Sequence, residues 1–310
     1  MNDLLDMGDK AITRPPRCEY DMNDAYRSVW VGHQRSSVPT PVTFPNSRGL
    51  NVVGSYFTGD PDCEKHCCVI YLHGNASCQL EGRFLVPKMV PAGVSVFCFD
   101  FSGCGNSQGE RVSLGYFERD DVACAISYLQ VNYHIERFFL WGRSMGAATA
   151  LLSLGSEHKI DGVIVDSPFS SLSQLIKELS SQMGIPGCFG GAAVWILASR
   201  IESSSGFDIR KVNPIEAARQ STVPIRFIHG ENDDFIICQH SRDIYSEYMG
   251  DNKEVWIVPG DHNTDRPDET MKSSYEFVYS CFNIEIGDIS NQFTEQTSRM
   301  HFKNVESMLK

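Results

Sequence analysis

A serine between two glycines has the setting in this sequence that points most directly to chemistry. The pentapeptide GRSMG at residues 142–146 follows the apolar segment FFLW and precedes the small-residue segment AATALLSL. This is the G-x-S-x-G pattern at a strand-to-helix turn, which exposes a serine hydroxyl at the edge of an α/β sheet. We predict that Ser144 is a nucleophile and that the main-chain N–H of Met145 stabilises an oxyanion. The alternative is an idle serine in a glycine-rich turn.

A serine nucleophile needs a base to accept its proton and an acid to orient that base. Three histidines, His240, His262 and His301, lie after the acidic segment ENDD of residues 231–234. His262 lies in PGDHN directly after the apolar segment EVWIV, so we expect it at the carboxyl edge of a sheet, where sites of open α/β sheets form. His240 falls in the next predicted helix and His301 in the polar terminal stretch. We therefore predict that His262 is the base.

The orienting acid should lie at the same sheet edge. Asp233 is in HGENDD, directly after the apolar segment PIRFI. Its neighbour Asp234 and the strand-ending Asp166 are the rivals, because only one carboxylate can face His262. We predict Asp233. For each of these aspartates the alternative is a helix cap or a turn residue.

A second oxyanion donor is expected from the segment HGNA, residues 73–76, which follows the apolar run CCVIYL. We assign the main-chain N–H of Asn75, with that of Ala76 as the alternative. His73 is expected to form structural hydrogen bonds rather than act as a base, and it is also one of the candidate pocket residues.

Apolar runs alternate with helical patterns along the chain, which predicts a mostly parallel central sheet with right-handed crossovers, flanked by helices: an α/β fold. The predicted strands include an opening hairpin and six buried runs. They are 41–44, 50–58, 67–72, 94–99, 137–141, 162–165, 225–228 and 255–258. The predicted helices are 116–131, 144–154, 241–248 and 271–282.

Three regions surround or interrupt this pattern. Residues 1–35 read as an N-terminal arm lying on the α/β domain of residues 36–283, and 284–310 as a polar C-terminal tail. A short helical lid is predicted around 170–222. The lid side chains proposed as an apolar wall for an acyl group, or as a face that touches a membrane, are Leu175, Leu179, Trp195 and Leu197. The alternative is that they pack against the domain.

Composition excludes several classes of function. The formal net charge of -12 argues against general nucleic-acid binding. The sequence has no signal-like N-terminus and no apolar run of about 18 residues, which predicts a cytoplasmic protein without a transmembrane segment and leaves only peripheral membrane contact open. The 11 cysteines are then expected to be reduced thiols.

No metal or cofactor is expected. The local cluster Cys63, His66, Cys67 and Cys68 lacks the two separated ligand pairs of a typical zinc site, and an ordinary turn entering a strand explains it. The glycine-rich segment at residues 100–107 is not part of a G-x-x-x-x-G-K-[ST] phosphate-binding loop.

Taken together, the motifs resemble those of α/β-hydrolases. HGN, DFSGCGNS, GRSMG, DSPFSSL, HGENDDFI and PGDHN occur in the order seen in that superfamily, over about residues 40–282. They look most like the compact α/β-hydrolase-domain depalmitoylases and like protist and plant proteins classed as unassigned serine peptidases of the prolyl oligopeptidase clan. The depalmitoylases carry an N-terminal cysteine cluster for membrane anchoring, whereas this region has only Cys18.

Three functions from different classes follow as hypotheses. The first is hydrolysis of a carboxylic ester or thioester through an acyl-enzyme, with a small-molecule or lipid-acyl substrate. The second is a serine peptidase of the prolyl oligopeptidase clan, although we expect no N-terminal propeller of the kind that restricts access in large oligopeptidases. The third is a non-catalytic binding protein on a hydrolase scaffold, which a missing triad member would favour.

Overall fold

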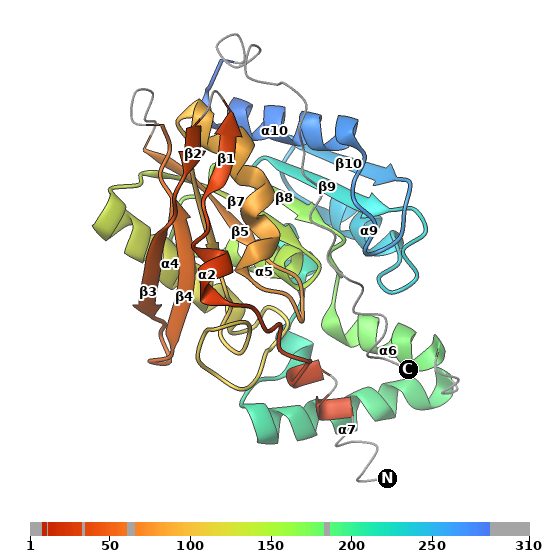
Figure 1. Cartoon of the computed structure of the whole chain (residues 1–310). Helices are drawn as coiled ribbons and strands as arrows, with labels where there is room; N and C mark the ends of the chain where they lie inside the picture. Colours follow the sequence, from red (N-terminus) through yellow and green to blue (C-terminus); the bar gives the residue numbers. More distant parts are fainter. Residues whose placement is uncertain (1–7, 11, 33–34, 61–65, 183–186, 286–310) are drawn as a thin grey trace.

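The structure, a computed structural model, describes residues 8–10, 12–32, 35–60, 66–182 and 187–285, with the side chains of 187–193 left out. Within these ranges, eight strands form one sheet in the order β10-β9-β8-β7-β5-β6-β4-β3. Neighbouring strands from β5 to β10 run parallel, while β4 is antiparallel to β6 and β3 is antiparallel to β4. The predicted fold class is therefore confirmed (Figure 1).

The strand bounds follow the apolar runs of the sequence. They are β3 (Thr40–Pro45), β4 (Asn51–Phe57), β5 (Cys67–Leu72), β6 (Ser95–Phe99), β7 (Arg137–Arg143), β8 (Gly162–Asp166), β9 (Ile225–Gly230) and β10 (Lys253–Val258).

Helices cover both faces of the sheet. One face packs on α4 (Glu118–Tyr133), α5 (Met145–Ser153), α8 (Pro214–Ala218) and α9 (Gln239–Glu247). The other packs on η2 (Gln79–Leu85), α3 (Val86–Met89), η3 (Val90–Ala92) and α10 (Asp268–Phe282). Figure 1 shows α9 and α10 on opposite sides of β9 and β10.

The burial of strand β5 on both faces of the sheet explains why its sequence is apolar throughout. Successive side chains of a strand point to opposite faces of the sheet. Cys68, Ile70 and Leu72 accordingly join the core on the α5 side, while Val69 and Tyr71 join the core on the α10 side. All six residues of β5 are buried, so neither face of the strand can accept a polar side chain without a partner.

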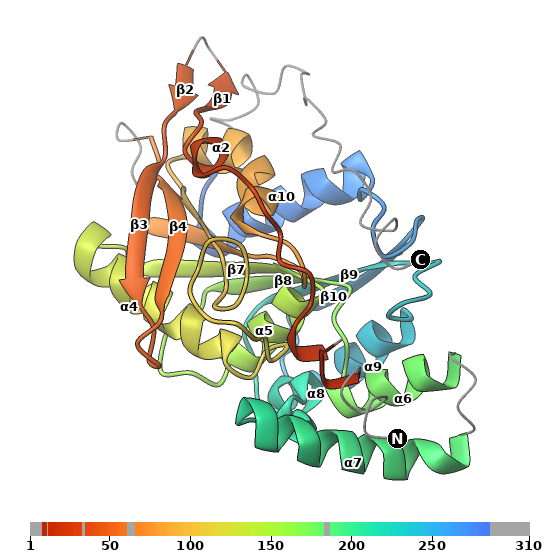
Figure 2. The same ribbon diagram turned by 60° about the horizontal axis from the view of Figure 1, so that its bottom comes forward.

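The lid consists mainly of two helices, α6 (Leu172–Gln182) and α7 (Gly187–Ser205), followed by the short η4 (Ile209–Lys211). Figure 2 shows α6 and α7 side by side at one end of the molecule. The apolar side chains of the lid form a core with Ala148 of α5 and with Phe169 and Ile236 of neighbouring loops. The lid is therefore packed against the body of the domain.

The N-terminal arm crosses the domain and contains α2 (Met22–Ala25) and a two-stranded ribbon of β1 (Val29–Gly32) and β2 (Arg35–Ser37). Near its start, Asp9 accepts hydrogen bonds from Arg111 at 3.1 Å and from Ser204 of α7 at 2.8 Å. Arg17 donates to main-chain carbonyls of the loop after β6, including that of Ser107 at 2.8 Å. The arm thus joins the lid to the loop after β6.

The double-sided burial of β5 leads to a stability prediction. Replacing Ile70, which is fully buried, with alanine should lower the free energy of unfolding by about 2–5 kcal/mol, because the methyl groups leave a cavity in a packed core. The control is Val131→Ala on α4, where the side chain is 74% exposed and the change should stay within about 0.5 kcal/mol. Urea unfolding measures both. Equal effects of the two variants would mean that β5 is not at the centre of the core.

Candidate active site

The turn between β7 and α5 holds Ser144 in a backbone conformation that few residues adopt. Ser144 has φ 53° and ψ −116°, and its main-chain N–H donates to Asp166 O at 2.8 Å. A Cβ on Gly142 would lie 2.3 Å from Gly146 O, and one on Gly146 would lie 1.9 Å from Leu72 O. Side chains at these two positions would therefore force the turn apart. The strain at Ser144 is of the kind that persists only where the surrounding structure holds it.

Three side chains predicted from the sequence come together at the carboxyl edge of the sheet. His262 Nε2 lies 3.1 Å from Ser144 Oγ, and His262 Nδ1 lies 2.6 Å from Asp233 Oδ2. Ser144 follows β7, Asp233 follows β9 and His262 follows β10. The edge of a parallel sheet thus joins residues that lie up to 118 positions apart in the chain.

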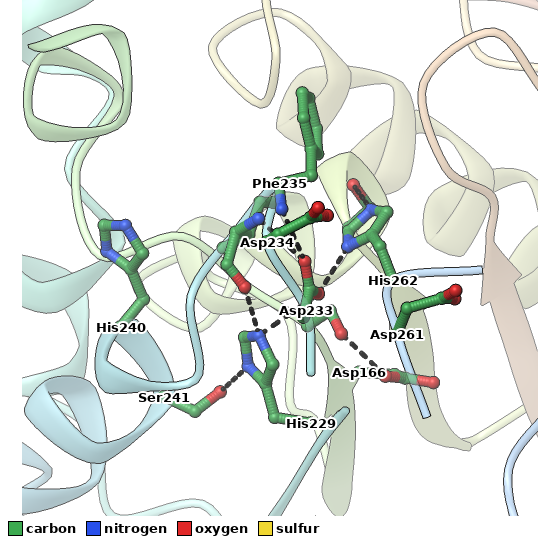
Figure 3. A network of polar contacts seen from close by, with 12 residues as sticks. Asp166, His229, Asp233, Asp234, Phe235, His240, Ser241, Asp261 and His262 are labelled. Carbon is green, nitrogen blue, oxygen red and sulfur yellow. Dashed lines mark hydrogen bonds and ion pairs between the residues drawn. The ribbon is translucent and has the colours of Figure 1, made fainter. Parts of the chain in front are cut away.

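Asp233 is held in a polar pocket of its own, between the rings of His229 and His262 (Figure 3). Its Oδ1 accepts main-chain N–H bonds from Phe235 at 3.1 Å and Ile236 at 2.8 Å, and its Oδ2 lies 3.3 Å from His229 Nε2. Burial alone would raise the pKa of Asp233, but hydrogen bonds from His229 and His262 hold that pKa well below its ordinary value.

The charge on Asp233 fixes the roles of the two nitrogens of His262. An ionised carboxylate only accepts hydrogen bonds, so Nδ1 of His262 must carry the proton that it donates to Asp233. In the neutral imidazole, Nε2 then has its lone pair toward Ser144 Oγ and can accept the hydrogen of the serine hydroxyl. This is the arrangement in which a histidine can take the proton of a serine nucleophile.

The rival acids have other surroundings. Asp234 is exposed. The carboxylate of Asp166 pairs with Arg266, whose Nη2 lies 2.8 Å from Asp166 Oδ1, and both side chains are buried. Arg266 also donates from Nη1 to Asp261 O at 3.0 Å, beside His262. Asp166 therefore supports the loop that carries His262 instead of facing its ring.

The other candidate histidines lie elsewhere. His240 Nδ1 accepts from Ser170 N at 3.2 Å, and its Nε2 lies 2.8 Å from Glu178 Oε2, so His240 joins α9 to the lid. His301 lies outside the described residues.

The candidate oxyanion donors lie beside the nucleophile. Met145 is the first residue of α5, and the first N–H groups of a helix have no partner within the helix. The loop that carries Asn75 passes close by, since a Cβ built on Gly74 would lie 3.8 Å from the Cβ of Ser144. The assignment of the N–H groups of Met145 and Asn75 as oxyanion donors stays a prediction, with Ala76 as the alternative to Asn75.

His73 shapes this loop from inside the protein. It is fully buried, its Nδ1 lies 2.7 Å from Gly74 O, and its Nε2 accepts from Phe101 N at 3.1 Å. Because Nε2 accepts, Nδ1 donates to the carbonyl of Gly74. His73 thus forms structural hydrogen bonds and is not exposed to a substrate pocket.

The four lid residues predicted to form an apolar wall do not lie together on one surface. Leu175 is 5% exposed, and Leu179 and Leu197 pack against the same lid core. Trp195 is 61% exposed and belongs to none of the buried clusters. The structure thus favours the alternative for the three leucines, which is packing within the lid and against the domain.

An apolar side chain that the sequence did not single out lies beside the triad instead. Phe235 is 48% exposed, and the centroid of its ring is 5.2 Å from that of His262. The sequence does carry a signal for Phe235, which is its position two residues after Asp233. The turn that places Asp233 at the sheet edge also places Phe235 there.

Cys63 lies outside the described residues. Within the described part of the chain, no three His, Cys, Asp or Glu side chains are grouped to hold a metal ion. Within the same ranges, no helix is both long and apolar enough to cross a membrane.

Comparisons with known proteins agree with this architecture. The family model described as "Serine aminopeptidase, S33" matches residues 64–204, which include Ser144. Protein YfhR of Escherichia coli K12 is 30% identical over 224 residues, or 69% of this chain and 71% of YfhR. The lysophosphatidylserine lipase ABHD12 of Macaca fascicularis is 26% identical over 193 residues, or 60% of this chain and 46% of ABHD12.

Among solved structures, the Pyrococcus furiosus esterase Pf2001 is similar with a TM-score of 0.65 and 20% identity, covering 86% of this chain and 99% of that protein. At this identity the likeness concerns the fold. With the relatives, the sheet order and the strand–turn–helix setting of Ser144, it leads to one conclusion: the chain belongs to the α/β-hydrolase superfamily.

Proposed function

We propose that this protein is a serine hydrolase that cleaves carboxylic esters or thioesters through an acyl-enzyme. The observation that carries the proposal is the continuous contact from Ser144 Oγ to His262 at 3.1 Å and from His262 to the buried Asp233 at 2.6 Å. In this proposal Ser144 is the nucleophile, His262 the general base and Asp233 the acid that orients it. All three members are present, which speaks against the non-catalytic alternative.

The first half of the reaction transfers the acyl group to the enzyme. Ser144 Oγ attacks the carbonyl carbon while its proton passes to His262 Nε2, and the imidazolium so formed faces the charged Asp233. The N–H groups of Met145 and Asn75 would donate to the oxygen that becomes negative. When the tetrahedral intermediate collapses, His262 returns the proton to the leaving alcohol or thiol, and the acyl group stays on Ser144.

The second half repeats these steps with water. His262 takes a proton from the water molecule that attacks the acyl-enzyme, and the same donors stabilise the second oxyanion. The proton then returns to Ser144 Oγ as the carboxylic acid leaves. Each step uses His262 alternately as base and acid, which requires Asp233 to stay ionised throughout.

The names of two similar proteins and an apolar side chain beside His262 support esters and thioesters as the substrate class. ABHD12 is named a lysophosphatidylserine lipase and Pf2001 an esterase, and both names denote cleavage of esters. The exposed ring of Phe235 beside His262 offers apolar contact to a bound acyl or alcohol group. The description of the matching family model as a serine aminopeptidase favours peptide cleavage as the second candidate.

The first test is covalent labelling. A fluorophosphonate probe should label the protein on Ser144, because the turn exposes a hydroxyl that His262 activates. Mass spectrometry of the digested adduct locates the phosphonyl group, and Ser144→Ala should abolish labelling. Labelling that persists in Ser144→Ala would remove this residue from the role of nucleophile.

The second test separates the two neighbouring aspartates. Asp233→Asn should lower kcat on the order of 10⁴-fold, because an amide can donate to His262 and so leaves the histidine in the wrong tautomer. Asp234→Asn is the matched control, and it should keep kcat within about threefold because Asp234 is exposed. Ester hydrolysis at saturating substrate measures both. If Asp234→Asn lost activity while Asp233→Asn kept it, Asp234 would be the orienting acid and Asp233 would not.

The third test concerns the substrate class. The enzyme should hydrolyse acyl thioesters of N-acetylcysteamine and monoacylglycerols with kcat/KM at least about tenfold above that for aminoacyl anilides, because thiols and alcohols leave more readily than amines. Ser144→Ala is the control for every substrate. Faster Ser144-dependent cleavage of the anilides would establish the peptidase instead.

A further inference from the structure

We infer that Glu81 and Arg143 act as positioning residues for the hydrolysis proposed above, on which this inference rests. Their ion pair joins the loop that carries Asn75 to the loop that carries His262, and holds both against the turn of Ser144. Neither side chain touches the reacting atoms. Their effect is on where the oxyanion donor and the base lie relative to the nucleophile.

Glu81 provides the connection to the oxyanion loop. Its Oε2 accepts a hydrogen bond from Gly74 N at 3.1 Å, one residue before Asn75. Its Oε1 accepts from Tyr71 Oη at 2.9 Å and from Arg143 Nη1 at 3.2 Å. One carboxylate therefore fixes the main chain of the oxyanion loop to strand β5 and to Arg143.

Arg143 provides the connection to the base. Its Nη2 donates to the main-chain carbonyl of His262 at 2.7 Å and to Asn263 Oδ1 at 3.1 Å. Arg143 also precedes Ser144 in the chain and ends strand β7. An unbroken series of contacts thus runs from the oxyanion loop through Glu81 and Arg143 to the backbone of the base.

The ion pair of Glu81 and Arg143 is largely buried, and each charge stabilises the other. The side chains of Glu81 and Arg143 are 12% and 27% exposed. Burial would raise the pKa of Glu81, but the charge of Arg143 and hydrogen bonds from Ser77 and Gly74 hold it below its ordinary value. Burial would lower the pKa of Arg143, but the charge of Glu81 holds it above its ordinary value. Both groups are therefore charged at neutral pH, and each needs the other.

Arg266 provides a second connection to the loop that carries His262. Arg266 Nη1 donates to Asp261 O at 3.0 Å and to Thr264 O at 3.2 Å, and its guanidinium pairs with Asp166. The loop of His262 is therefore held even when Arg143 is changed. Only the pair of Glu81 and Arg143 also reaches the oxyanion loop, so its loss should misplace the two groups relative to each other without releasing either loop. A misplacement of about 1 Å can cost about 100-fold in rate.

The other end of β7 offers a matched control. Arg137 begins this strand and pairs with Asp161 at 2.9 Å, with side chains 31% and 7% exposed. Like Arg143, it also binds the main chain of a distant segment, donating to the carbonyls of Cys281 at 2.6 Å and Phe282 at 2.8 Å. It lies at the opposite edge of the sheet from Ser144, so its loss tests stability without touching the site.

The experiment compares Glu81→Gln and Arg143→Lys with Asp161→Asn and Arg137→Lys, all in the full chain. With a thioester or ester that the wild type cleaves, the first two variants should lose about 10- to 100-fold in kcat while KM stays within about threefold. The double variant should lose little more than the worse single variant, because the two residues act as one unit. The control variants should keep kcat within about twofold, even where their melting temperatures fall as far as those of the site variants.

Two outcomes would overturn the inference. One is Glu81→Gln keeping kcat within twofold of the wild type, and the other is the two control variants losing as much kcat as the site variants. Should Arg143→Lys not fold, hydrogen exchange in Glu81→Gln decides: exchange must speed up at residues 73–76, where Gly74 N loses its charged acceptor, and unchanged exchange there overturns the inference. A wild type without Ser144-dependent turnover would instead contradict the proposed function, and the positioning role with it.

Discussion

The close approach of the turn after β7 to the end of β5 is the constraint on which the candidate site depends. Gly146 lies so near Leu72 O that no side chain fits between them. Because the turn is pressed against β5, the loop after β5 passes directly beside Ser144, and α5 begins at the next residue, Met145. A looser contact would separate Ser144, which we propose as the nucleophile, from the loop of Asn75, which we propose as the source of an oxyanion donor.

The parallel sheet brings the candidate site residues to one edge, but it does not by itself set the distances between the loops that carry them. The loops after β5, β7, β9 and β10 each contribute one part of the site. Hydrogen bonds within the sheet fix the strands, whereas the loops extend beyond them. Two arginines, Arg143 and Arg266, bridge these loops, and each is neutralised by a carboxylate. Charged pairs suit this purpose, since a guanidinium can donate to several carbonyl and carboxylate oxygens in a fixed geometry.

The sequence predicted the parts of the structure that local patterns control. The apolar runs gave the eight strands of the main sheet, and the segments GRSMG, HGENDD and PGDHN gave the three residues that meet at its edge. The ribbon of β1 and β2 was missed because its strands are short and none of their residues is fully buried. The pairing of Glu81 with Arg143 was also missed, because it joins residues 62 positions apart and neither stands in a pattern that names its partner. The lid wall stays a prediction, because an apolar stripe on a helix does not say which surface it packs against, and its three leucines pack in or against the lid core.

The roles of the aspartates at the sheet edge show how surroundings decide between similar side chains. Asp166 ends the buried strand β8, Asp233 follows β9, and both aspartates are buried themselves. A buried carboxylate needs a charged partner or several hydrogen bonds. Asp166 has a permanent cation in Arg266, so it gains little from the transient charge of a histidine. Asp233 has two main-chain N–H bonds and two imidazole rings, and no arginine or lysine among these contacts. In the proposed mechanism, a positive charge forms on His262, and the surroundings of Asp233 suit it to stabilise that charge better than those of Asp166, which supports the proposal of Asp233 as the acid.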